Sequence, residues 1–251
     1  MLPKILKPKH EYELMRLGKD HDGGYVVEKK SVEKTTNLLS FGLADDWSFE
    51  KDFKKFNQNI IIKCYDHTVN KKYWSVYLWH NIGRLIFFKI SIKKFLSKIK
   101  TYFDYKKFFI SNDITHFERA LGVGDLNNVI SLLEASEGLE NIFLKIDIEG
   151  GEYRALNDII KIQDKLEGLV IEFHNIDLNL QKITNFIENF NLTLVHIHAN
   201  NSDFINNNIP AMIEVTFAKK PVKLKDHPSI PHKLDQICEP KRRDINLIFN
   251  E

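Results

Sequence analysis

The chain has 251 residues, enough to bury the core of one α/β domain, and 43% of them are hydrophobic. Its net charge of +2, from 36 basic and 34 acidic residues, argues against a nucleic-acid-binding surface that covers the molecule. Two cysteines, Cys64 and Cys238, lie far apart without a CxxC motif, which excludes a disulfide scaffold and a cysteine-rich zinc site.

The cysteine usage fits a reducing compartment, and residues 1–10 contain no apolar run, so we expect a cytoplasmic protein without a secretory signal. No uninterrupted apolar run approaches the length of a membrane span, so no transmembrane segment is expected. We interpret residues 1–251 as a single domain with an insertion at about 70–106 and an extended, proline-containing tail at 219–251.

Asp22-Gly23-Gly24 precedes an apolar, β-branched run that begins at Tyr25, which predicts a turn entering a short strand. The turn is either a simple hairpin or a place where glycine lets the backbone approach a ligand.

Residues 37–41 predict the first central strand, and a helix is predicted from Ser48 to about Asn57. Between them, Gly42 is the only glycine, and no P-loop lysine follows. A pyrophosphate site, and with it a nicotinamide dehydrogenase, is therefore disfavoured.

Residues 60–65 predict the second strand, which ends at Asp66-His67-Thr68. An acid at this strand end, somewhat over twenty residues after the first glycine turn, is where Rossmann-like sheets hold ribose hydroxyls. The alternative is an aspartate that only opens a turn.

Residues 69–107 are dense in aromatic residues and lysines and interrupt the alternation of strands and helices. Apolar residues from Leu85 to Ile99 are spaced for an amphipathic helix. A core helix with a solvated basic face is the preferred interpretation; a cap over the active site, a dimer contact and a membrane-surface helix are the alternatives.

The remaining elements continue the α/β alternation. A third strand is predicted at 108–111, ending at Asn112-Asp113, followed by a helix at 125–137. Later strands are predicted at 142–148, 166–173, 192–197 and 211–218, with helices beginning at 152 and spanning 178–190, and a loop at 206–208.

Polar residues end several of these strands: Asp147, Glu172, His174 and His198. The carboxyl ends of parallel strands meet at one edge, where ligands bind. Carboxylates with imidazole predict a divalent metal site, with Mn favoured over Mg by the histidine. Alternatively, each histidine is a structural residue, and Asp147 and Glu149 only place negative charge at the start of the next helix.

The segment L-K-I-D-I-E-G-G-E-Y resembles the K-I-D-x-E-G-x-E signature of FkbM-type S-adenosylmethionine-dependent methyltransferases. The resemblance extends to D-G-G-Y-V-V, S-F-G-L-A-D-D-W-S-F-E, Y-D-H-T, I-E-F-H and H-I-H-A-N-N, and spans about residues 16–218. It departs from the family at the glycine-poor first turn and in the basic, aromatic insertion.

The resemblance implies a class I methyltransferase fold: an α/β, Rossmann-like, seven-stranded, mostly parallel sheet with helices on both faces and an antiparallel last hairpin. Gly42 and its neighbours would hold the methionine part of S-adenosyl-L-methionine, Asp66 the ribose, and the Asn112-Asp113 turn the adenine. The full set of expected cofactor contacts is Gly24, Tyr25, Phe41, Gly42, Asp45, Glu50, Asp66, His67, Asn112, Asp113 and Asp147.

Similar family members methylate sugar hydroxyls in capsule and surface-polysaccharide pathways. The resemblance therefore implies O-methylation of a sugar, such as a nucleotide-activated heptose, with Asp147, Glu172 and His174 binding Mn or Mg, and His198 or His174 taking the proton. A metal-independent enzyme with a histidine base, or a non-catalytic binding domain, are the alternatives. We expect no nucleic-acid partner, and a homo-oligomer is possible.

Overall fold

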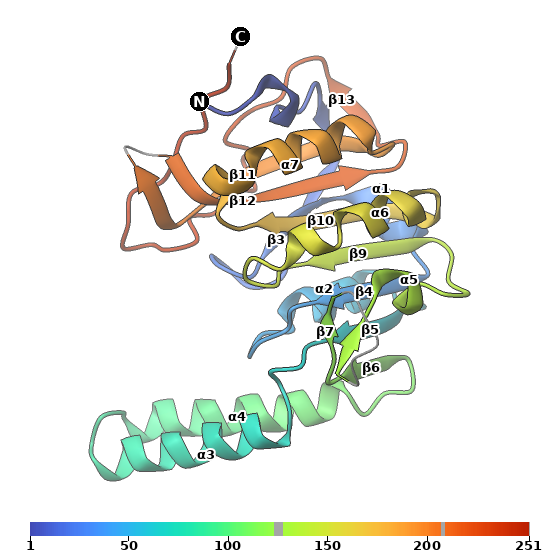
Figure 1. Ribbon diagram of the computed structural model, residues 1–251. Helices are drawn as coiled ribbons and strands as arrows, with labels where there is room; N and C mark the ends of the chain where they lie inside the picture. The colour runs from blue at the N-terminus through green and yellow to red at the C-terminus, as the bar shows by residue number, and fades with distance from the viewer. Residues whose placement is uncertain (123–127, 207–208, 251) are drawn as a thin grey trace.

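The computed structural model describes residues 1–122, 128–206 and 209–250. Its centre is a seven-stranded sheet in the order β11-β12-β10-β9-β4-β5-β6 (Figure 1). The strands are β4 (Asn37–Phe41), β5 (Ile61–Tyr65), β6 (Ile114–Phe117), β9 (Ile142–Ile146), β10 (Leu166–Phe173), β11 (Thr193–Asn206) and β12 (Ile209–Ala218).

Only β12 runs antiparallel to its neighbours, β10 and β11; the other pairings are parallel. This is the class I methyltransferase sheet that the sequence predicts. Every residue of β9 and β10 is buried, as the continuous apolar runs of these strands indicated.

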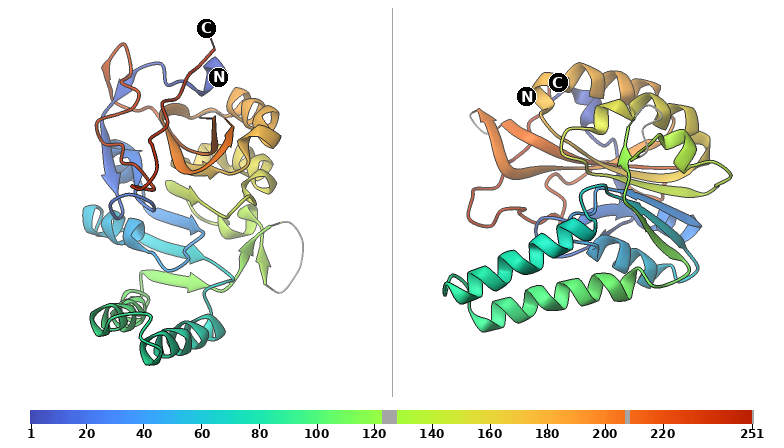
Figure 2. Two further views of the ribbon diagram at one scale, coloured as in Figure 1. Left: turned by 90° about the vertical axis from the view of Figure 1, so that its left-hand side faces the viewer. Right: turned by 60° about the horizontal axis from the view of Figure 1, so that its bottom comes forward.

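Two apolar cores cover the two faces of the sheet. One lies under α5 (Leu132–Ala135), α6 (Leu156–Ile162) and α7 (Ile176–Asn189). The other lies under α1 (Lys29–Lys34), α2 (Ser48–Phe56) and the strand pair β2 (Leu14–Leu17) with β3 (Tyr25–Glu28). Figure 2 shows these layers from two further sides.

Short elements complete the fold. Strand β1 (Glu11–Tyr12) pairs with β13 (Lys223–Lys225) in the tail, and β7 (Ala120–Leu121) pairs with β8 (Val129–Ile130). The 3-10 turns are η1 (Lys4–Leu6), η2 (Glu152–Arg154) and η3 (Gln163–Lys165). None of the helices in the described part of the chain is long and apolar enough to cross a membrane.

The insertion forms a hairpin of two helices, α3 (Lys71–Ile86) and α4 (Ile92–Phe108), that projects from the body (Figures 1 and 2). The prediction of one core helix through 85–99 is therefore wrong. Phe88 takes a left-handed φ of 55° after α3, and the Ser91 side chain caps α4 by accepting from the Lys94 N–H. No residue of α4 is buried.

Two other predicted elements differ from the structure. The third strand begins at Ile114 and not at 108, because residues up to Phe108 continue α4. Of the helix predicted at 125–137, residues 125–127 lie outside the described residues, 129–130 form β8, and only Leu132–Ala135 is helical.

Candidate functional site

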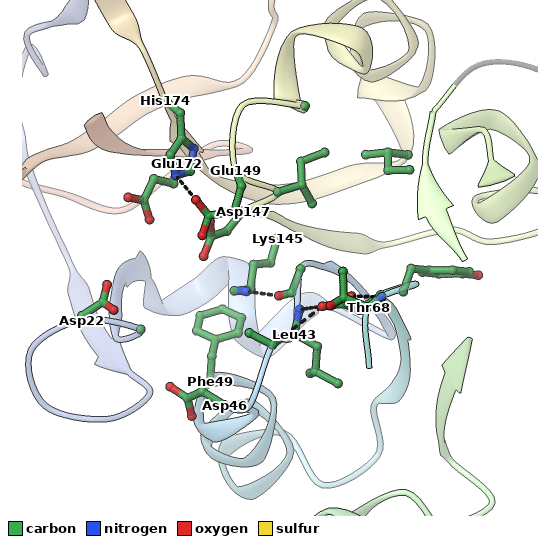
Figure 3. Close-up of a pocket in the computed structure, with 18 of the residues that line it drawn as sticks. Asp22, Leu43, Asp46, Phe49, Thr68, Lys145, Asp147, Glu149, Glu172 and His174 are labelled. Atoms are coloured by element: carbon green, nitrogen blue, oxygen red, sulfur yellow. Dashed lines mark hydrogen bonds and ion pairs between the residues drawn. The ribbon is translucent and has the colours of Figure 1, made fainter. Parts of the chain in front are cut away.

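A cavity of ≈ 570 Å³ opens at the carboxyl ends of the central strands (Figure 3). Its volume is in the range of small-molecule sites. The wall is built by the turns after β4, β5 and β9, by the loop before β3, and by residues of β10, β11 and β12. Seven predicted cofactor contacts line it: Tyr25, Gly42, Asp45, Glu50, Asp66, His67 and Asp147.

The turn after β4 is held by Asp66 at the end of β5. One carboxylate oxygen of Asp66 accepts from the backbone N–H groups of Leu43 and Ala44, both at 2.9 Å. The other accepts from the N–H and hydroxyl of Thr68, at 2.7 and 2.6 Å. Burial tends to raise the pKa of Asp66, but these four donors outweigh it and lower the pKa. Asp66 therefore shapes the cavity wall as well as facing it.

Gly42 lets the ends of β4 and β9 approach each other. Its φ is +86°, and a Cβ built there would lie 1.6 Å from the carbonyl oxygen of Asp147. No other residue type fits that space. Close packing against the end of β9 therefore requires a glycine at position 42 of this turn.

A lysine and a glutamate lie buried behind this turn. Lys145 Nζ donates to the carbonyl of Gly42 at 2.8 Å, and Ser40 donates to Glu50 at 2.5 Å. Burial would lower the pKa of Lys145, but Glu50 and Asp147 raise it on balance, so the ammonium stays charged. Among the described residues, the second carboxylate oxygen of Glu50, Oε2, is buried and has no hydrogen-bond partner, and Glu50 lines the cavity. A buried polar atom without a partner favours a bound group that can hydrogen-bond to it.

Tyr25 bridges two carboxylates. Its hydroxyl lies 2.8 Å from Asp147 Oδ2 and 3.5 Å from Glu172 Oε2, and Asn200 donates to the other Glu172 oxygen at 2.8 Å. Burial, and then the charge of Asp147, raise the pKa of Glu172 well above its usual value. This bias of Glu172 toward its protonated form reduces its repulsion from Asp147.

Three possible metal ligands meet at the end of β9: Asp147, Glu149 and His174 each offer an atom within 4.8 Å of the others. His174 Nε2 lies 3.5 Å from Glu149 Oε2, and its Nδ1 lies 2.9 Å from Glu152 Oε1. A carboxylate on one imidazole nitrogen orients the other toward a metal. Burial lowers the pKa of His174, but Glu152 reverses this and raises it.

This cluster differs from the predicted ligand set, which stays a prediction, because it contains Glu149 and not Glu172. The Glu172 carboxyl instead lies against the Tyr25 hydroxyl and accepts from Asn200. The prediction assumed that Glu172 and His174 share a face of an extended strand. Strand β10 ends at Phe173, so His174 lies beyond the extended strand, and its Nε2 lies beside Glu149.

Four predicted residues lie outside the cavity wall. Gly24 packs against Lys19 and Arg16, and Phe41 stacks on Tyr65. Asn112 and Asp113 precede β6, at the amino edge of the sheet, so they cannot form the predicted adenine turn at the carboxyl edge.

His198, predicted as a base, does not line the cavity either. It is buried between strands, with Nδ1 3.3 Å from Glu214 Oε2. Glu214 also accepts from Cys238 of the tail at 3.7 Å. Glu214 thus joins His198 of the sheet to the tail, and His174 is the predicted base that lines the cavity.

Sequence reasoning placed Glu149 beside Asp147 at the strand end but did not name it as a ligand, and it did not assign Lys145 or Glu152 to the site. Glu149 and Glu152 stand in the K-I-D-x-E-G-x-E signature, so the motif itself was the available signal. Asp22 and Asp46 also line the cavity, from loops whose approach only the tertiary structure reveals.

No family model and no curated protein matches the chain. It is similar to solved structures of the precorrin-6y C5,15-methyltransferase of Geobacter metallireducens GS-15 (12% identity, 76% of this chain and 86% of that one, TM-score 0.38) and of an rRNA methylase of Streptococcus thermophilus (11%, 76% and 90%, 0.42). A third is the fibrillarin pre-rRNA processing protein of Methanococcus jannaschii (8%, 79% and 70%, 0.38). At these identities and TM-scores the likeness carries no argument about activity or substrate.

Proposed function

We propose that the chain is an S-adenosylmethionine-dependent O-methyltransferase. The observation that carries the proposal is the charge of the cavity: eight carboxylates against three cationic side chains. The carboxylates are Asp22, Asp45, Asp46, Glu50, Asp66, Asp147, Glu149 and Glu172, and the cations are Lys19, Lys145 and Arg154. The excess persists if Glu50 and Glu172, whose pKa values are raised, keep their protons.

An acidic cavity at the carboxyl edge of this sheet suits a ligand that carries an ammonium and a sulfonium group. The unpaired Oε2 of buried Glu50 supports a donor at the turn after β4. Ribose hydroxyls would meet Asp66 only by replacing the hydrogen bonds from Thr68. Tyr65, Ala120 and Leu121 supply an apolar wall suited to a purine.

Methyl transfer forms an O–C bond and breaks the C–S bond, whose electron pair stays on sulfur, while the acceptor hydroxyl gives up its proton. His174 Nε2 faces the cavity with Nδ1 held by Glu152, which suits it to accept that proton. Positioning by the turns after β4 and β9 would supply the in-line geometry.

A divalent ion at Asp147, Glu149 and His174 would instead lower the pKa of a bound hydroxyl. The proximity of these three residues supports a role of the His174 imidazole as a metal ligand and not as a base. The carboxylate of Glu152, which lies beside the other imidazole nitrogen, supports the same role. A sugar hydroxyl, such as that of a nucleotide-activated heptose for capsule synthesis, is the proposed acceptor. Arg154 is an exposed cation on the wall that suits a phosphate, whereas Lys19 pairs with Asp46.

The test is calorimetry with S-adenosylmethionine, followed by methyl transfer to a panel of sugars and nucleotide sugars with and without EDTA. We expect binding, and turnover on one sugar class. Loss of turnover in EDTA and rescue by Mn or Mg would assign His174 to a metal, and unchanged turnover would assign it as the base. No binding of S-adenosylmethionine would contradict the proposal and favour a non-catalytic domain.

A further inference from the structure

The helical hairpin has a packed root and an unpacked end. Its root, Tyr73 to Tyr77 on α3 and Tyr102 to Phe108 on α4, packs against the core beside α2 and β5. Asp104 accepts from the Trp47 indole N–H at 3.0 Å and fastens the root further. Beyond it, residues 79–100, here the distal hairpin, extend away from the body (Figures 1 and 2), although Lys98 reaches back to it, at 3.9 Å from Asp45.

Large apolar side chains lie open on the distal hairpin. Phe88 is 95% exposed, Phe87 73% and Trp79 72%. Ile86, Ile92 and Leu96 are also exposed. All but Trp79, which lies near the middle of α3, occupy the end of α3, the connecting turn and the start of α4, which together are the tip of the hairpin. Such a patch marks an interaction surface.

The helical hairpin as a whole, α3 with α4, is strongly basic. Residues 71–108 contain ten lysines and arginines and a single acid, Asp104, although the whole chain is nearly neutral. Lys89, Lys93, Lys94 and Lys100 are exposed among the apolar side chains of the tip. An exposed apolar tip ringed by flexible cations matches the two parts of an anionic lipid surface: acyl chains and phosphate headgroups.

We propose that the distal hairpin docks the protein on an anionic lipid membrane. The Phe87 and Phe88 side chains enter the boundary between headgroups and acyl chains, and the surrounding lysines lie at the level of the lipid phosphates. The hairpin leaves the body after Tyr65, at the carboxyl end of β5, which is the edge where the cavity opens. The membrane is therefore bound on that side of the molecule.

Two other occupants fit less well. A nucleic acid could pair with the lysines and stack on the phenylalanines, but it offers nothing for Ile86, Ile92 and Leu96. A second copy could cover the apolar tip, but it would bring two strongly basic hairpins together.

The test is co-sedimentation of the full chain with vesicles of phosphatidylcholine alone or of phosphatidylcholine and phosphatidylglycerol in equal parts. We expect binding to the anionic vesicles only, weakened by salt of about 0.5 M. Trp79 is exposed while Trp47 and Trp74 are buried, so a blue shift of tryptophan fluorescence on binding should disappear in Trp79→Phe.

The double variant Phe87→Ser/Phe88→Ser, and separately the triple variant Lys89→Glu/Lys93→Glu/Lys94→Glu, should each bind anionic vesicles at least about tenfold more weakly. The controls are Leu178→Ser and Lys233→Glu, which change an exposed leucine and an exposed lysine outside the hairpin. Both variants should bind anionic vesicles like the parent chain. All changes are on the surface, and unchanged thermal unfolding verifies the fold.

Absence of binding to anionic vesicles by the parent chain would overturn the proposal. So would equal binding by the tip variants, a tip-dependent dimer in light scattering, or tip-dependent binding to a single-stranded RNA in place of vesicles. None of these measurements uses methyl transfer, so they stand or fall separately from the proposed activity.

Discussion

Asp66 illustrates how one side chain both builds and faces the site. All four of its acceptor positions are used by Leu43, Ala44 and Thr68. Asp66→Asn puts an amide donor against these N–H and O–H groups, and we expect a loss of about 1–3 kcal/mol in the free energy of unfolding. Urea denaturation measures this. Asp164→Asn, a change at an exposed aspartate in η3, is the control.

The same residue predicts a dependence on pH. Because the folded-state pKa of Asp66 is lowered, its contribution to stability is present above the unfolded pKa of about 3.9 and is lost as pH falls through the folded value. The difference in stability between the parent chain and Asp66→Asn should therefore shrink below about pH 4. A difference that stayed constant from pH 7 to pH 3 would contradict this role of the carboxylate.

Glu152 is the residue that decides how His174 is used. Its Oε1 accepts from the N–H groups of Ile148 and Gly150 and lies 2.9 Å from His174 Nδ1. If the cluster binds Mn, Glu152→Gln should weaken the affinity about 10–100-fold, because the imidazole loses its orienting carboxylate. Calorimetric titration with Mn checks this, with Glu188→Gln on the exposed side of α7 as the control. Equal affinity in both variants would remove Glu152 from the metal site.

At the scale of elements, the turn between β4 and α2 depends on one glycine. Gly42→Ala places an alanine in the left-handed region and its Cβ against the Asp147 carbonyl. We therefore expect the free energy of unfolding to fall by at least about 1–2 kcal/mol. Gly83→Ala is the matched comparison, since it lies inside α3 with open space around it and should gain about 0.5–1 kcal/mol. Chemical denaturation of the two variants should therefore give shifts of opposite sign.

Elements buried on both faces were predictable from the sequence, because burial demands a continuous apolar run. Strands β4 and β10 were predicted with their observed bounds, and β9 closely. The third strand was not, because the apolar residues 108–110 lie at and just after the end of α4, whereas β6 contains Thr115 and His116. What makes β6 a strand is its pairing with β5, which no local pattern reports.

The site was predictable to the extent that strand ends define it. Asp66 and Asp147 follow directly from the ends of β5 and β9. That Glu149, and not Glu172, lies beside His174 was not predictable, because it depends on where β10 ends and on the Tyr25 hydroxyl, which comes from a different part of the chain.

At the scale of the molecule, the tail couples the two ends of the chain around the cavity. Gln236 Oε1 accepts from the His21 N–H at 2.7 Å, and the Ile237 carbonyl lies 2.9 Å from His21 Nδ1. This contact supports the loop that carries Asp22 and Gly23 into the cavity wall. Asn201 of β11 in turn holds the tail by hydrogen bonds. Its side-chain amide donates to the carbonyls of Glu239 and Arg243 and accepts from the Glu239 N–H.

Asn201→Ala should therefore act at a distance. The amide is completely buried, and its loss leaves the Glu239 N–H and carbonyl unpaired, at a cost of about 1–3 kcal/mol. Freed from β11, the tail should support the 18–24 loop less well, so hydrogen exchange of that loop should quicken while β4 stays protected. As a control, Asn189→Ala removes a side-chain hydrogen bond at the exposed end of α7 and should leave the hydrogen exchange of the 18–24 loop unchanged. Equal exchange of the 18–24 loop in both variants would show that the tail packs on the sheet without bracing the cavity wall.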